Sequence, residues 1–211
     1  MPAFDFAEQL LAWHAREGRH DLPWQHPRSD YRVWLSEIML QQTQVRTVIP
    51  YFENFLSRFP SLRALADASE QDVMQAWAGL GYYSRARNLH QTARICVQRH
   101  GGELPRDLDA LTALPGIGRS TAGAILSQAH GGRYAIVDGN VKRVLTRFFA
   151  IDGDAASSAV GKKLWELAES LLPHERMADY SQAIMDLGAT VCTRSKPACT
   201  RCPLARNCMA L

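Results

Sequence analysis

The middle of the chain reads LPGIGRSTA from Leu114 to Ala122, and a strongly helical run extends from Ser120 to His130. Pro115, Gly116 and Gly118 predict a turn too tight for residues with a Cβ, so we expect a hairpin between two helices. The N–H groups of the glycines and of the second helix's first turn would face one way and could bind a phosphate oxygen. Such a site reads a nucleic-acid backbone and not its base sequence. A common Gly-x-Gly turn that binds nothing is the alternative.

A second short motif reads VDGN from Val137 to Asn140 and precedes a run with helical periodicity. Asp138 would cap this helix, and the positive end of the helix dipole would keep its carboxylate ionised. A carboxylate beside a phosphate-binding hairpin is electrostatically unfavourable unless a positive charge develops nearby during a reaction. A purely structural N-cap is the alternative role for Asp138.

Length and composition set broad limits. A chain of 211 residues with 46% hydrophobic content can bury a sizeable core, as one domain or as two small lobes. The net charge of +3 does not prove a nucleic-acid partner, but it permits one where basic residues cluster. No apolar run is long enough to span a bilayer, and the N-terminus lacks the pattern of a signal peptide. We therefore expect a soluble, cytoplasmic protein with no membrane partner.

Hydrophobic periodicity predicts helices along the whole chain. One predicted helix runs from Tyr31 to Val45, another opens at Tyr82-Tyr83, and a loop is predicted from Gly153 to Ser158. No strand signal in the sequence is longer than the one at Tyr134–Val137. These patterns predict an all-α fold without internal repeats or a flexible linker.

Glu37 has a mostly apolar flank on its predicted helix, since Val33, Trp34 and Leu40 lie three or four residues away. Burial would raise the pKa of this carboxyl and keep a proton on it near neutral pH, which a general acid requires. An ordinary glutamate at a helix edge is the alternative. We expect Glu37 to keep its proton and Asp138 to stay ionised. If the fold brings them together, this is the pattern by which two carboxyl groups divide the work of glycosidic bond cleavage.

Cysteines are concentrated at the end of the chain. Cys192, Cys199, Cys202 and Cys208 are separated by six, two and five residues. Four thiolates on one short segment could hold zinc or a [4Fe-4S] cluster, and the presence of a single close pair favours the cluster. Basic residues interleaved with these ligands could contact a phosphate backbone, with solvated surface charge as the alternative. They are Arg194, Lys196, Arg201 and Arg206.

These motifs resemble the helix-hairpin-helix base-excision glycosylases that carry an iron–sulfur cluster, the superfamily of endonuclease III. The resemblance runs from about Leu11 to Cys208 and rests on the cysteine spacing, the hairpin and the aspartate motif. Further segments resemble the MutY-type adenine DNA glycosylases within that superfamily. They are WLSEIMLQQTQV from Trp34 to Val45, LPW from Leu22 to Trp24, GLGYY from Gly79 to Tyr83 and DLGA from Asp186 to Ala189.

The resemblance implies a particular fold, substrate and cofactor. It implies a six-helix lobe with the hairpin over residues 22–133, and a helical lobe formed by residues 1–21 and 134–211 that holds a [4Fe-4S] cluster on the four cysteines. The partner would be double-stranded DNA in which adenine lies opposite 8-oxoguanine or guanine. We expect a monomeric, bacterial, cytoplasmic enzyme that acts at the nucleoid.

The resemblance also implies a mechanism in which the adenine is extruded from the duplex into a pocket. Glu37 would protonate adenine N7, Asp138 would stabilise the cationic sugar directly or through a transient covalent bond, and water would complete the hydrolysis. Such enzymes are monofunctional.

The same resemblance assigns contacts with the bases. Gln42 and Tyr82 would enter the stack beside 8-oxoguanine, and an exposed aromatic side chain such as Tyr82 can stack on a base. Leu40, Trp24 and Gln182 would lie near the adenine. Core packing is the alternative for Leu40 and Trp24, and a plain surface amide is the alternative for Gln182.

The chain departs from the endonuclease III pattern at Ser120, where bifunctional members of that superfamily place a Schiff-base lysine. A hydroxyl cannot form an imine, so water should be the acceptor and strand nicking should be weak. Lys142 is the nearby amine that could trap an abasic sugar, although a phosphate contact is its more ordinary role.

A second departure concerns length. Full MutY-type enzymes continue into a second domain that helps to recognise 8-oxoguanine, whereas this sequence stops at Leu211. As a natural short form or as a piece of a longer chain, it should discriminate 8-oxoguanine from guanine less well. A bifunctional pyrimidine glycosylase with lyase activity and a non-catalytic iron–sulfur DNA-binding protein remain the alternative functions.

Overall fold

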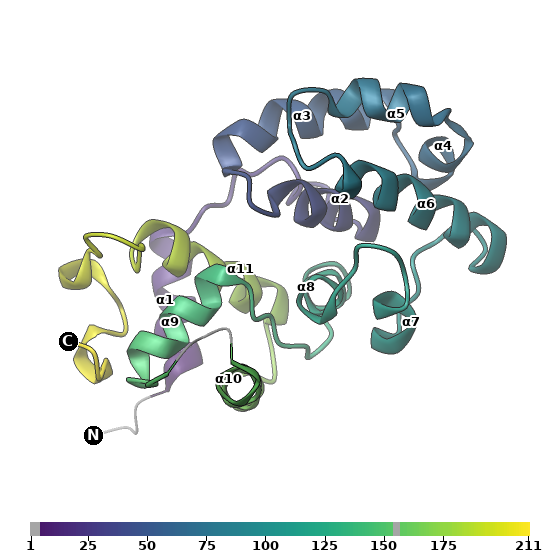
Figure 1. The fold of residues 1–211 in the computed structure, drawn as a ribbon. Helices are drawn as coiled ribbons and strands as arrows, with labels where there is room; N and C mark the ends of the chain where they lie inside the picture. The colour runs from purple at the N-terminus through teal and green to yellow at the C-terminus, as the bar shows by residue number, and fades with distance from the viewer. Residues whose placement is uncertain (1–4, 154–156) are drawn as a thin grey trace. The chain divides into compact units, whose positions relative to one another are not determined.

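The computed structural model describes residues 5–153 and 157–211, and this part of the chain is helical without any strand. It contains the α-helices α1 to α11 and two short 3₁₀ helices, η1 and η2 (Figure 1). The predicted all-α fold is confirmed. Residues 154–156 of the predicted loop at Gly153–Ser158 lie outside the described residues. Among those residues, no helix is long and apolar enough to cross a membrane.

The described residues divide into two compact units, which we describe separately. The central unit is Asp21–Ala129, and the terminal unit combines the segment up to His20 with His130–Leu211. Each unit therefore needs its own apolar core and its own set of helix caps.

The central unit contains seven helices. Their bounds are α2 (Asp30–Leu40), α3 (Val45–Arg58), α4 (Leu62–Asp67), α5 (Glu70–Trp77), α6 (Ser84–Arg99), α7 (Leu108–Thr112) and α8 (Arg119–His130). Helix α6 packs against α2, α4 and α5. Large apolar side chains that are fully buried fill the space between the helices, including Trp34, Phe52, Phe55 and Trp77.

Short polar residues fix where several of these helices begin. The hydroxyls of Ser29, Ser61 and Ser69 each accept a hydrogen bond from a backbone N–H in the first turn of the helix that follows. Asp107 does the same for α7, a short helix that the sequence did not predict. Because the first N–H groups of a helix have no partner within it, such caps stabilise each start by about 1 kcal/mol.

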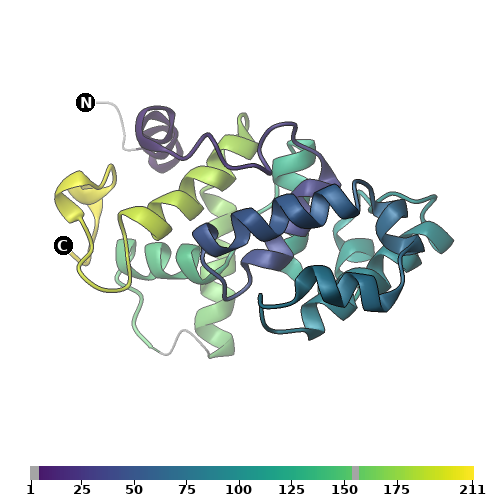
Figure 2. The same ribbon diagram turned by 90° about the horizontal axis from the view of Figure 1, so that it is seen from above.

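The terminal unit consists of α1 (Phe6–Glu17), α9 (Gly139–Phe148), α10 (Ser158–Ser170) and α11 (Met177–Thr190), followed by η1 (Cys199–Arg201) and η2 (Ala205–Asn207). Helix α11 packs against both α1 and α9, and the two views show α9 and α11 side by side (Figure 1 and Figure 2). Helix α11 has the most buried residues of these helices, and the C-terminal segment, yellow in both views, follows it directly.

A buried carboxylate joins α11 to the segment after α1. Asp186 is fully buried, and it accepts hydrogen bonds from Arg19 N and Nε at 2.8 Å and from Gln182 Nε2 at 2.8 Å. His14 Nε2 lies 3.6 Å from the same carboxylate. Burial pushes the pKa of Asp186 upward, but His14 and Arg19 outweigh this effect and hold the pKa below its usual value. The carboxylate therefore stays ionised inside the unit.

The helix predicted from Tyr31 to Val45 is confirmed as far as Leu40 and is wrong beyond it. Helix α2 ends at Leu40, Gln42 has a φ of 58°, and a new helix, α3, begins at Val45. Local sequence favours a continuous helix here. The break arises because carbonyl groups at the end of α2 accept hydrogen bonds from Arg85, a residue on a distant helix.

Candidate active site and cysteine segment

Glu37 lies in the second half of α2 and is partly exposed. Val33 and Trp34, one turn earlier, are buried. Oε1 of Glu37 accepts a hydrogen bond of 3.3 Å from Nε2 of Gln128, a buried residue on α8. Since α8 begins at the predicted hairpin, this bond connects the candidate acid with the helix that the hairpin starts.

Asp138 caps α9 through its side chain. Its Oδ1 accepts a hydrogen bond of 2.7 Å from the Val141 N–H, and its Oδ2 lies 3.3 Å from Asn140 Nδ2. Burial is the largest influence and raises the pKa of Asp138 above its usual value, although these hydrogen bonds and the charge of Arg143 oppose it. The helix end does lower this pKa through its backbone N–H groups, and the ionised state of the Asp138 carboxylate stays a prediction. The cap is present, but loss of solvent outweighs it.

A chain of hydrogen bonds runs from Asp138 to the segment Cys192–Cys208, which we call the cysteine segment. Asn140 bonds to Asp138, and its Oδ1 accepts a hydrogen bond of 2.9 Å from Arg143 Nη2. Arg143 Nε donates to the Cys192 carbonyl at 2.7 Å, and Nη2 donates to the carbonyl of Gly188. The helix that presents Asp138 is thus fastened to the first of the four cysteines.

Gly188 allows α9 and α11 to approach at this point. A Cβ on Gly188 would stand 2.6 Å from the Asn140 Cβ and 2.9 Å from the Asn140 carbonyl oxygen. We expect Gly188→Ala to destabilise the protein by roughly 1–3 kcal/mol, because the helices must move apart. Gly161→Ala on α10 is the matched control: its Cβ would have no neighbour within 4 Å, and alanine favours a helix. Thermal melts showing equal stability for both variants would contradict this reading of the contact.

The four cysteines are partly buried and lie on and around η1 and η2. Burial raises the pKa of Cys202, and the charges that the other three thiols would carry, on Cys192, Cys199 and Cys208, raise it further. The thiols therefore influence one another electrostatically. Within residues 5–153 and 157–211, however, no three His, Cys, Asp or Glu side chains are arranged as a metal site.

Helix α9 also supports the cysteine segment at its C-terminal end. Arg147 Nη1 donates to the Thr193 carbonyl at 2.7 Å and lies 3.4 Å from Cys192 Sγ. The basic side chains predicted between the ligands, Arg194, Lys196, Arg201 and Arg206, are all exposed. One of them is paired, since Arg201 lies 3.4 Å from Glu17.

The hairpin residues Leu114 and Ile117 are buried, whereas Gly116 and Gly118 are exposed. Gly116 has a φ of 77°, and a Cβ there would stand 3.0 Å from the Asn88 Cβ, so this position favours glycine. Gly118 has an ordinary φ and nothing within 4 Å of its Cβ position. The prediction that Gly118 is needed for a tight turn is therefore wrong.

The other residues predicted to contact DNA differ in how far they are exposed. Tyr82 is 56% exposed with a φ of 49°, and Gln42 is exposed with a φ of 58°. Trp24 is buried with its ring 5.5 Å from the ring of Phe52, which is a core position, and Leu40 is partly exposed. Gln182 is buried against Asp186, so the alternative of a plain surface amide is wrong.

Two positions concern the fate of the sugar. Ser120 is partly exposed in the first turn of α8, and Lys142 is partly exposed on α9. The central unit thus contains Glu37, Gln42 and Tyr82, while the terminal unit contains Asp138 and the cysteines. The approach of Asp138 to Glu37 stays a prediction.

Arg85 was not singled out from the sequence. An arginine in a polar helix is ordinarily solvated, yet this guanidinium is buried and makes contacts with three segments of the central unit. Asn140 and Arg143 were also missed as supports of Asp138. Their spacing in the first turns of a helix that begins at a capping aspartate is the signal that could have indicated them.

Comparison with known families places this arrangement in a class. Residues 35–170 match the family described as HhH-GPD superfamily base excision DNA repair protein. The chain belongs to this superfamily. The matched residues include the candidate acid, the hairpin and the capped aspartate.

Particular relatives are similar over the whole chain. An adenine DNA glycosylase of Buchnera aphidicola subsp. Acyrthosiphon pisum is 45% identical over 100% of this chain and 60% of its own length. An adenine DNA glycosylase of Homo sapiens is 49% identical over 97% of this chain and 39% of its own length. This chain therefore spans less than two thirds of the length of these curated relatives.

A solved structure of a thermostable thymine-DNA glycosylase shares the fold. It superimposes with a TM-score of 0.87 at 30% identity and covers 97% of this chain and 94% of its own. The helical arrangement is therefore found in a relative whose named base is thymine and not adenine.

Proposed function

We propose that this protein removes adenine from double-stranded DNA in which the adenine lies opposite 8-oxoguanine or guanine, by hydrolysis of the N-glycosidic bond. One observation carries the proposal: the whole chain is 45% identical to a protein named adenine DNA glycosylase. The two carboxyl groups that the reaction requires, those of Glu37 and Asp138, are present on α2 and at the start of α9.

In this proposal Glu37 protonates adenine N7, and Asp138 stabilises the positive charge that develops on the sugar. The raised pKa of Asp138 supports this role, because a carboxylate poorly stabilised by solvent gains most from a cation beside it. Gln128 orients the Glu37 carboxyl through its 3.3 Å hydrogen bond. Gln42 and Tyr82 would enter the base stack, and the exposed residues Gly116 and Gly118 would contact phosphate through their backbone amides.

The decisive assay uses a labelled duplex with adenine opposite 8-oxoguanine, followed by alkali to cleave any abasic site. Strand cleavage is expected in this duplex, and none in a matched duplex with cytosine opposite 8-oxoguanine. A third duplex with thymine opposite guanine tests the second candidate, which the similarity to a thymine-DNA glycosylase favours. Cleavage of that duplex alone would overturn the proposed substrate.

Ser120 predicts a monofunctional reaction, because its hydroxyl cannot form an imine with the abasic sugar. Borohydride is therefore expected to trap little enzyme on DNA, while a control glycosylase with a catalytic lysine is trapped efficiently. Lys142→Ala should remove whatever trapping remains. High trapping that survives Lys142→Ala would contradict a water-only mechanism.

We further propose that Cys192, Cys199, Cys202 and Cys208 hold a [4Fe-4S] cluster. The donor set supports this, since four partly buried thiols lie on one short segment and influence each other's ionisation. When bound, the cluster would cross-link the C-terminal segment and hold its basic side chains toward a phosphate backbone.

A [4Fe-4S] cluster and a zinc ion can be told apart by the colour and the metal content of the purified protein. We expect the purified protein to be brown and to contain iron, whereas a zinc site would be colourless. Cys202→Ala should lose the metal and lower the melting temperature, because metal binding contributes to folding. Cys96→Ala, which changes a buried cysteine of the central unit, should retain the metal. A colourless protein with zinc in stoichiometric amount would exclude the cluster.

A further inference from the structure

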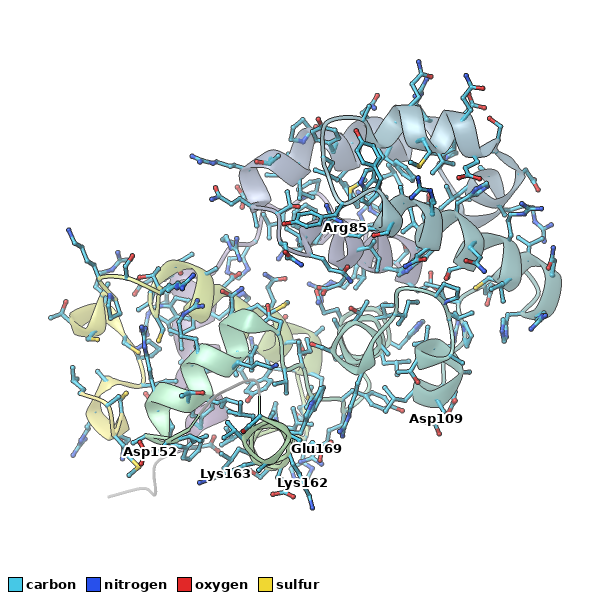
Figure 3. The ribbon with its side chains drawn as sticks, in the orientation of Figure 1. Arg85, Asp109, Asp152, Lys162, Lys163 and Glu169 are labelled. Atoms are coloured by element: carbon cyan, nitrogen blue, oxygen red, sulfur yellow. The ribbon has the colours of Figure 1, made fainter. Side chains whose placement is uncertain are left out.

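Arg85 connects two loops of the central unit that are far apart in sequence. Its side chain extends from α6 toward α2 (Figure 3), and it is only 7% exposed. Nη1 donates to carbonyl groups at the end of α2. Nη2 donates to the loop that follows α2 and to the loop that precedes α6. The acceptors of Nη1 are Ile38 O at 3.0 Å, Met39 O at 2.8 Å and Gln41 O at 2.6 Å. Those of Nη2 are Thr43 Oγ1 at 3.2 Å, Leu80 O at 3.4 Å and Gly81 O at 3.2 Å.

These hydrogen bonds provide partners for backbone carbonyl groups in two loops that contain left-handed residues. The last carbonyl groups of a helix lack partners within it and carry the negative end of its dipole, so a buried guanidinium is a well-matched partner. Gln42 and Tyr82 each lie beside a carbonyl that Arg85 binds, and each has a positive φ, 58° and 49° respectively. Left-handed backbone at residues other than glycine persists where the surroundings enforce it.

Arg85 also contacts one of the two side chains directly. Its guanidinium carbon lies 5.3 Å from the centre of the Tyr82 ring and 5.4 Å from that of Trp77. Trp77 in turn donates from Nε1 to the Gly81 carbonyl at 3.0 Å. A guanidinium stacked on an aromatic face restricts the orientation of that ring. The orientation of exposed Tyr82 is therefore coupled to the same group that shapes the Gln42 loop.

We propose that Arg85 is a positioning residue that holds Gln42 and Tyr82 at a fixed separation, so that both side chains enter the DNA base stack together. The proposal rests on the proposed function in one respect, namely that these side chains do enter the stack. The clamp itself can be tested without DNA.

The first experiment measures amide hydrogen exchange along the full chain for the wild type and for Arg85→Met. We expect exchange to accelerate by about tenfold or more at residues 41–43 and 80–83, and to stay unchanged in the helices of the same unit. Arg85→Lys should give an intermediate result, since one ammonium cannot reach both loops. Arg87→Met is the matched control, because Arg87 lies on α6 in an exposed pair with Glu70. Unchanged exchange in either loop, or uniform acceleration through the unit, would overturn the clamp.

The second experiment measures single-turnover adenine release at saturating enzyme. Arg85→Met should slow release by roughly 10- to 100-fold, with unchanged affinity for an undamaged duplex. In a Gln42→Ala/Tyr82→Ala background, the same change should cost less than about twofold, because the positioned side chains are already gone. An equal loss in both backgrounds would show that Arg85 acts elsewhere. If the wild type releases no adenine, the proposed function fails, while hydrogen exchange still decides on the clamp.

Discussion

Replacing Glu37 by glutamine is expected to abolish measurable adenine release, a loss of about 100- to 10,000-fold, while affinity for duplex DNA survives. Glutamine has the shape of glutamate and can still bond to Gln128, so the local structure should be kept. It cannot donate the proton that makes adenine a leaving group. Since the change adds no negative charge, contacts with phosphate should not weaken.

The measurement pairs single-turnover kinetics with a binding titration on the duplex that carries adenine opposite 8-oxoguanine. Glu53→Gln, an exposed change on α3, is the matched control and should behave as wild type. A non-catalytic DNA-binding protein would show the same behaviour before and after the Glu37 change. Wild-type rates in Glu37→Gln would therefore remove Glu37 from the mechanism.

Asp138→Asn is expected to slow adenine release by about 100-fold or more and, at neutral pH, to stabilise the fold. Burial raises the pKa of Asp138, so the folded protein binds a proton here more readily than the unfolded chain does. The ionised carboxylate then costs stability, and that cost appears as pH rises through the folded-state pKa. Asparagine removes the charge while its oxygen can still accept the hydrogen bond from the Val141 N–H.

Thermal melts over a range of pH give the sign directly. The melting temperature of Asp138→Asn should exceed that of wild type near pH 7.5, and the difference should vanish below about pH 3, where both states of the wild type are protonated. Asp152→Asn, an exposed change in the same unit, should show no such trend. If Asp138→Asn is less stable than wild type at neutral pH, the helix cap and not burial controls this carboxyl.

Local sequence was sufficient where one element specifies its own ends. The aspartate before Gly139 predicted a capped helix, and the Val141 N–H does bond to its side chain. Ser120 to His130 was predicted as helical, and α8 covers Arg119–His130. In such segments the capping residue and the apolar period lie within a few residues of each other, so no distant contact is needed to read them.

Prediction failed where a distant group controls the outcome. The helix from Tyr31 was expected to continue to Val45, but a guanidinium more than forty positions along the chain binds the carbonyl groups at its end. The helix end that caps Asp138 is visible in the sequence, whereas the burial that raises the pKa of this carboxyl depends on what packs around it. The surface alternative for Gln182 fails for the same reason, since its hydrogen bond to Asp186 lies inside the unit.

The carboxylate of Asp186 also limits how far this protein can be shortened. Its charge is neutralised by Arg19, which lies beyond the end of the first helix, so the beginning of the chain supplies the counter-ion for a residue near its other end. Proteolysis that removed this leading segment would leave the Asp186 carboxylate buried without its counter-ion, and this would lower the free energy of unfolding by about 3–5 kcal/mol. A minimal version must therefore keep Arg19, and keeping His14 as well requires the opening helix, even though neither residue takes part in the proposed chemistry.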